Sequence, residues 1–152
     1  MIPFIQPNLE TFLSYLNKLE PTTAPQWGTM NAQRMVEHLS EVLQMSIGNG
    51  PKAELLIPAD KIEKMQAILE SDTPMPKDFK APFAPEEYTL RNEELELAID
   101  EFVDSWLAFE EYYEEDPERV VLHPFYGDLN GKQWYRLHSK HFTHHFEQFN
   151  LL

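Results

Sequence analysis

The chain has 152 residues, 42% of them hydrophobic, which fits a single domain with a substantial core over residues 1–152. It contains no cysteine, which excludes disulfides, thiolate metal ligands and cysteine nucleophiles. Its formal net charge is −14 with only 12 Lys and Arg residues, which argues against nucleic acid as a partner.

The sequence also lacks the patterns that direct a chain into or across a membrane. The first residues carry no basic stretch followed by a long apolar segment, so we expect no signal peptide. No apolar run approaches the ~20 residues that a membrane-spanning helix needs. A cytoplasmic location without membrane contact is therefore expected.

The first third of the chain predicts two amphipathic helices. Asn8 can cap a helix that extends to about Glu20, where prolines follow. Asn31 can cap a second helix that continues to about Ile47, where glycines and a proline end it. In both segments the apolar residues recur at helical spacing, so each helix has one face for a core.

The middle of the chain combines an irregular link with a long helix. Residues 59–70 have the spacing of a short helix, whereas residues 71–85 contain four prolines and cannot form regular structure. We interpret this link as a strap between helices, with a lid over a functional site as the alternative. A further amphipathic helix is expected from Thr89 or Asn92 to about Tyr113.

The last part of the chain predicts a connector and a final helix. Residues 119–130 form the connector, with turn chemistry at Gly127 and Asp128. Asp128 or Asn130 can cap the final helix, which reaches about Gln148. Four long amphipathic helices without strand alternation predict an all-α, four-helix bundle.

Four of the six histidines lie in the final predicted helix, at His138, His141, His144 and His145. At about 100° per residue, His138, His141 and His145 share one narrow apolar stripe, and His144 lies off it at the surface or helix edge. Each buried imidazole nitrogen needs a partner, and a divalent metal ion is one.

A fifth histidine completes a candidate metal site. His38 faces the same way as the apolar residues of the second helix, and His141 and His145 stand one turn apart on the final helix. Two ligands from one helix and a third from a facing helix are typical of metal sites in bundles. Three histidines leave a coordination position open, which is the pattern of a catalytic site. Nitrogen ligation favours zinc or nickel, with copper or ferrous iron as alternatives. Such an ion can lower the pKa of a bound water or bind an incoming thiol as thiolate.

Other polar residues have several interpretations. His138 can be a group beside the ligands, a proton carrier, a fourth ligand, or a buried histidine bonded to backbone or carboxylate. His123 either holds the connector against the mouth of the site or has no chemical role. Glu41 and Glu110 either hydrogen-bond a metal ligand or are ordinary surface acids.

Two stretches resemble the DinB/YfiT-like superfamily of metal-dependent enzymes. One runs from Trp27 to Leu39 around His38, and the other runs from His123 to Gln148 through the paired histidines of the final helix. The order of the predicted helices, including the long link, is compatible with that superfamily over nearly the whole chain.

The resemblance implies an up-down-down-up four-helix bundle, His38, His141 and His145 as metal ligands, and often a homodimer. It also implies an ion that activates a low-molecular-weight thiol, for S-transfer, isomerisation or hydrolysis of a small molecule. Two hypotheses follow: a metal-dependent hydrolase or thiol S-transferase acting on a small molecule, or a non-catalytic metal-binding or ligand-binding helical bundle.

Overall fold

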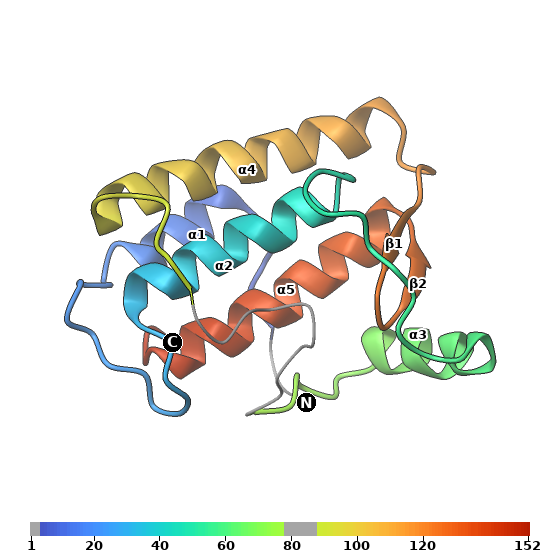
Figure 1. Cartoon of the computed structure of the whole chain (residues 1–152), viewed down its shortest axis with the longest axis horizontal. Coiled ribbons are helices and arrows are strands. Elements are labelled where there is room, and N and C mark those ends of the chain that lie inside the picture. Colours follow the sequence, from blue (N-terminus) through green and yellow to red (C-terminus); the bar gives the residue numbers. More distant parts are fainter. Residues whose placement is uncertain (1–3, 78–87) are drawn as a thin grey trace.

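The computed structural model describes residues 4–77 and 88–152, and this part of the chain is mostly helical (Figure 1). In chain order its elements are α1 (Leu9–Leu16), α2 (Ala32–Met45), the 3₁₀ turn η1 (Ala59–Lys61), α3 (Ile62–Glu70), α4 (Leu95–Glu115), β1 (Val121–His123), β2 (Gly127–Leu129) and α5 (Gly131–Gln148).

Asparagine caps begin three of these helices, as the sequence predicts. The Asn8 side chain accepts the backbone N–H of the third residue of α1, and Asn31 does the same at α2. At α5, Asn130 accepts from the Gln133 N–H while the Gln133 side chain accepts from the Asn130 N–H, which completes a capping box. The caps fix where each helix begins.

Some helix ends differ from the prediction. Helix α1 ends at Leu16 rather than near Glu20, because the next residues form tighter turns in which Leu19 N–H donates to the Leu16 carbonyl. Helix α4 begins at Leu95, since the backbone N–H and the side-chain amide of Asn92 both donate to Glu37 of α2, which holds Asn92 outside the helix. These differences leave the order of the helices unchanged.

The connector holds a β-hairpin, so the prediction of an all-α fold is wrong there. Strand β1 (Val121–His123) pairs antiparallel with β2 (Gly127–Leu129), and His123 stands opposite Gly127. Gly127 has φ of +75°, and a Cβ there would lie 2.9 Å from Cγ2 of Ile62. Strands of three residues are too short to show alternation in the sequence.

An aromatic cluster joins the helices at the centre of the core. The Phe12 ring of α1 meets Phe102 and Trp106 of α4 and Phe142 of α5 edge to face, at centroid distances of 5.9, 4.8 and 4.9 Å. Helix α2 packs along α4, and Figure 1 shows α2, α4 and α5 running side by side. This arrangement turns one face of α2 towards one face of α5.

Helix α3 stands apart from the long helices, beside the hairpin (Figure 1), and is held by two cations of α5. Lys140 is buried, and its ammonium donates to the carbonyls of Ile68 and Ser71 at 3.0 and 3.1 Å. Arg136 also donates to the Ser71 carbonyl, at 2.8 Å. These cations satisfy carbonyl groups that the end of a helix leaves free.

The link that follows α3 is described only in part. Residues 71–77 form neither helix nor strand, as predicted. The rest of the predicted strap or lid, residues 78–85, lies outside the described residues. Among the helices of the described part, none is both long and apolar enough to cross a membrane.

Candidate metal centre

Three imidazole rings converge where α2 faces α5. Nε2 of His141 lies 3.0 Å from Nε2 of His38 and 3.0 Å from Nε2 of His145. All three candidate ligand atoms lie within 4.8 Å of one another. An ion about 2.0–2.1 Å from each nitrogen would hold neighbouring nitrogens roughly 3 Å apart. The three histidines are therefore close enough to hold a metal ion, and we call them the histidine triad.

The surroundings of the histidine triad keep its members neutral. His141 and His145 are buried, and His38 is half-buried. Burial lowers the pKa of His38 to about 4, and the nearby charge of Arg34 adds to this. Burial and then the neighbouring imidazoles place the pKa of His141 well below its usual value, and burial does the same for His145. Neutral imidazoles offer the lone pairs that a metal ion binds.

A glutamine fixes the orientation of His145. Nδ1 of His145 lies 2.7 Å from Oε1 of Gln148, and because an amide oxygen only accepts, Nδ1 carries the proton. The Nε2 lone pair of His145 then points into the triad. The Gln148 amide nitrogen donates to the Trp27 carbonyl at 3.0 Å, which fixes the side chain in this orientation. The Trp27–Gly28 segment thus acts on the triad through Gln148, a link that the sequence does not reveal.

The central imidazole has no satisfactory partner in the described part of the chain. Nδ1 of His141 is buried and forms no hydrogen bond there, and its Nε2 faces two other Nε2 atoms. A proton on His141 Nε2 can be well shared with only one neighbour, and a proton on His141 Nδ1 leaves the Nε2 lone pairs of His141 and His145 facing each other. A cation at the centre would bind all three lone pairs. The donor set therefore fits a divalent metal ion.

His138 does not join the triad, although it shares its helix. It is fully buried, and its Nε2 lies 3.0 Å from the Ser46 hydroxyl at the end of α2. Its ring stacks on Trp134 and meets Phe109 edge to face, at centroid distances of 5.7 and 4.7 Å. The structure places His138 in the aromatic core, and a catalytic role for it stays a prediction.

The remaining polar residues considered from the sequence lie around the site or away from it. His144 is half-buried at the edge of α5, with its ring 5.4 Å from that of Trp27. His123 accepts the backbone N–H of Phe125 at 3.0 Å, which stabilises the hairpin turn. Glu110 lies on α4, and in the described chain no hydrogen bond joins it to the triad. Nothing in the described residues therefore connects Glu110 with the triad.

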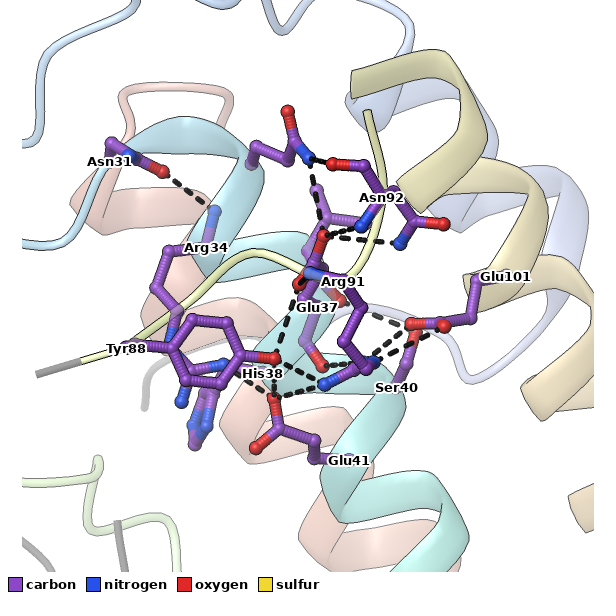
Figure 2. A network of polar contacts seen from close by, with 12 residues as sticks. Asn31, Arg34, Glu37, His38, Ser40, Glu41, Tyr88, Arg91, Asn92 and Glu101 are labelled. Carbon is purple, nitrogen blue, oxygen red and sulfur yellow. Dashed lines mark hydrogen bonds and ion pairs between the residues drawn. The ribbon is translucent and has the colours of Figure 1, made fainter. Parts of the chain in front are cut away.

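A buried glutamate that sequence reasoning missed organises the segment before α4 (Figure 2). The Glu37 carboxylate accepts from the Tyr88 hydroxyl at 3.1 Å, and from the backbone N–H groups of Arg91 at 2.8 Å and Asn92 at 3.1 Å. Burial acts to raise the pKa of Glu37, but hydrogen bonds from the backbone of Arg91, the side chain of Gln33, and the side chain and backbone of Asn92 outweigh it and lower that pKa. Glu37 therefore stays ionised and holds residues 88–92 on α2. No sequence motif marked it.

Within the described ranges Glu41 is bonded to two arginines and a tyrosine, and not to a member of the triad. Its Oε2 accepts from Arg34 at 2.5 Å, from Arg91 at 3.0 Å and from the Tyr88 hydroxyl at 3.0 Å. Burial acts to raise the pKa of Glu41, yet the hydrogen bonds from the two arginines lower it overall. Figure 2 shows this carboxylate on the same side of α2 as the His38 ring. Glu41 is thus an ionised group beside the site.

A half-open groove of about 600 Å³ borders the site at His38. His38 and Glu41 line one part of it, and Met45, Leu56, Ser105 and Pro124 line other parts. His38 therefore belongs both to the triad and to the groove. A small molecule in the groove would meet the triad at His38.

The comparisons with known proteins identify a family without a known activity. The chain belongs to the family described as Protein of unknown function (DUF1569), whose model matches residues 5–151. No curated protein and no solved structure was found to match the chain.

Proposed function

We propose that this protein is a metal-dependent enzyme whose divalent ion is bound by His38, His141 and His145. The observation that carries the proposal is the convergence of three Nε2 atoms, with both short contacts made by His141. The nitrogen donor set favours zinc or nickel, with ferrous iron as an alternative.

The chemistry follows from the open position of a three-histidine site. A divalent ion bound there would lower the pKa of a water or of a low-molecular-weight thiol, so we propose a hydrolase or thiol S-transferase acting on a small molecule. Gln148 would hold His145 in its binding tautomer, and His38 would face the arriving substrate from the groove.

The proposal extends to fold family and assembly. The resemblance around His38 and along α5 supports membership of the DinB/YfiT-like superfamily, with α1, α2, α4 and α5 as an up-down-down-up bundle. In that arrangement α3 and the hairpin would be additions to the bundle. A cytoplasmic homodimer is part of the same proposal, and light scattering of the purified chain would test the dimer.

A non-catalytic metal-binding or ligand-binding bundle is the second candidate, and one observation favours it. In the described residues no carboxylate hydrogen-bonds the triad, because Glu41 is bonded to Arg34 and Arg91. A proton-transfer group beside the ion is therefore not in place. Assaying small electrophiles with and without thiols, on loaded and metal-free protein, separates the candidates: turnover that needs the ion supports the enzyme.

Metal analysis tests the site itself. Untagged protein, loaded with zinc and dialysed, should retain about one ion per chain. The variant with His141→Ala and His145→Ala should retain none, and the control His144→Ala should match the wild type, because His144 lies on the same helix outside the triad. Equal metal content in the wild type and the double variant would contradict the proposal.

A further inference from the structure

A stripe of α2 carries two charged residues beside the proposed ligand. Arg34, His38 and Glu41 are spaced i, i+4 and i+7, which places them on the same side of a helix. Figure 2 shows the Arg34 side chain running beneath the Tyr88 ring towards His38 and Glu41. Helical spacing thus places Arg34 one turn before His38 on the same side of α2.

Arg34 uses little of its hydrogen-bonding capacity. Its guanidinium lies on the Tyr88 ring, 3.3 Å from the centroid, and Nη1 donates to Glu41 at 2.5 Å. Nε and Nη2 form no hydrogen bond with any residue of the described ranges. Yet the residue is only 8% exposed. These two nitrogens form an edge with parallel N–H groups, which matches the two oxygens of a carboxylate.

Arg91 is the contrast, because its nitrogens are occupied. It donates to Glu41 at 3.0 Å, to the Glu37 carbonyl at 3.2 Å, and to both carboxylate oxygens of Glu101. These bonds tie the segment before α4 to α2 and α4. Of these two arginines, Arg34 is the one with donors to spare.

The charge of Arg34 acts on the triad. Arg34 lies one turn before His38 on α2, and its guanidinium is bonded to Glu41, one turn after His38, so its positive charge is held beside the His38 side of the triad. A buried cation beside a divalent ion is unfavourable unless an anion lies between them. Glu41 offsets part of this repulsion, but it is also shared with Arg91. An anionic ligand at the site would offset the rest.

We propose that Arg34 binds a carboxylate of the substrate while another atom of the same molecule reaches the ion. This inference rests on the proposed function, and it names the substrate class as small carboxylates that carry a metal-binding group. Glu37, Glu41 and Glu101 surround the arginines, which disfavours a phosphate with two negative charges. The groove includes Glu41 but not Arg34, so a ligand would reach Arg34 past its present partner.

Two thiols that differ in one group test the inference on the whole chain loaded with Co²⁺. Mercaptoacetate and 2-mercaptoethanol both bind through sulfur, and only the first has a carboxylate. The affinity of each thiol is measured by titration, from the sulfur-to-cobalt charge-transfer absorption band. We expect Arg34→Gln to weaken mercaptoacetate about tenfold or more and to leave 2-mercaptoethanol unchanged. The control Arg119→Gln, which removes an arginine paired with Glu115 at the end of α4, should behave as wild type.

The opposite change provides a second test that does not depend on the folding of Arg34→Gln. Glu41→Gln removes the carboxylate that now occupies Arg34, and it should tighten mercaptoacetate relative to 2-mercaptoethanol. Cobalt content is measured first: a chain that takes up no cobalt contradicts the proposed function and this inference with it. Cobalt uptake with the same preference between the thiols in wild type, Arg34→Gln and Glu41→Gln overturns the inference alone.

Discussion

Two parts of α5 bury the same residue type in opposite ways. His138 is fully buried among aromatic rings and meets the Ser46 hydroxyl, a partner from within the chain. One turn further on, Nε2 of His141 faces only other imidazole nitrogens, whereas Nδ1 of both histidines lacks a hydrogen-bond partner in the described residues, so the difference lies at Nε2. A buried histidine with a protein partner can be structural, whereas one that lacks such a partner points to a ligand from outside.

Glu37 belongs with His138 as a buried group whose partners lie within the chain, and its removal should have the largest effect on stability. Glu37→Ala leaves the backbone N–H groups of Arg91 and Asn92 without their acceptor. We expect a loss of about 3 kcal/mol in the free energy of unfolding, measured with urea. Glu118→Ala, at an exposed turn, is the control and should change stability little. A loss no larger than that of the control would contradict the role of Glu37.

Zinc binding should change the free energy of unfolding by a comparable amount, and this change should depend on His141 but not on His138. Zinc at about 100 times its dissociation constant should stabilise the folded chain by about 2.7 kcal/mol, or roughly 5–10 °C in Tm. His141→Ala should abolish this shift, and His138→Phe should retain it. A shift lost in His138→Phe but kept in His141→Ala would reverse the comparison.

A change at Gln148 tests whether its hydrogen bond to His145 Nδ1 orients that imidazole for metal binding. Gln148→Leu removes the acceptor of His145 Nδ1, so we expect zinc affinity to fall about 10–100-fold, measured by competition with a chelator. Gln66→Leu is the matched control, because Gln66 bonds hairpin carbonyls away from the triad. An unchanged zinc affinity in Gln148→Leu would exclude the positioning role.

The pH dependence of the metal-free chain reports both environments. Burial lowers the pKa of His138 to about 3 and that of His38 to about 4, from the ordinary histidine value of 6.5. Below pH 6.5 the unfolded chain binds protons at these residues and the folded chain does not, so the free energy of unfolding falls as pH falls towards 4. Each such histidine contributes up to about 1.4 kcal/mol per pH unit. His138→Phe should reduce the slope between about pH 6 and 4 by that amount, and an equal slope would show that His138 is not buried in neutral form.

Among these changes, substitution of Ser46 should have the smallest effect on the free energy of unfolding. Ser46→Ala removes the partner of His138 Nε2, and we expect a loss of about 1 kcal/mol in the free energy of unfolding. Zinc stoichiometry should stay at the wild-type value, since Ser46 does not contact the triad. A variant that lost zinc binding would show that the two histidine environments depend on each other, which contradicts their separation.

The sequence predicts much of this arrangement because it depends on local patterns. Asn8, Asn31 and Asn130 mark the helix starts, and helical spacing places His141 and His145 on one side of α5. The convergence of His38 with that pair follows from two amphipathic faces meeting. The sequence therefore predicted the candidate site better than its surroundings.

What the sequence could not show depends on contacts between distant segments. Glu37 gave no signal, because the backbone N–H groups that it binds lie more than fifty residues away on an irregular segment. Gln148 gained its role only through the carbonyl of Trp27. The hairpin was missed because its strands are too short for a pattern. His138 could not be separated from the triad, since it occupies the same stripe of α5 as His141 and His145.

The most direct test of the histidine triad is a crystal structure of zinc-loaded protein with data collected on both sides of the zinc absorption edge. We predict one anomalous peak about 2.0–2.1 Å from Nε2 of His38, His141 and His145. A zinc-loaded crystal with no peak among these three atoms, and with His141 Nε2 hydrogen-bonded to one neighbouring imidazole, would contradict a metal site in the histidine triad.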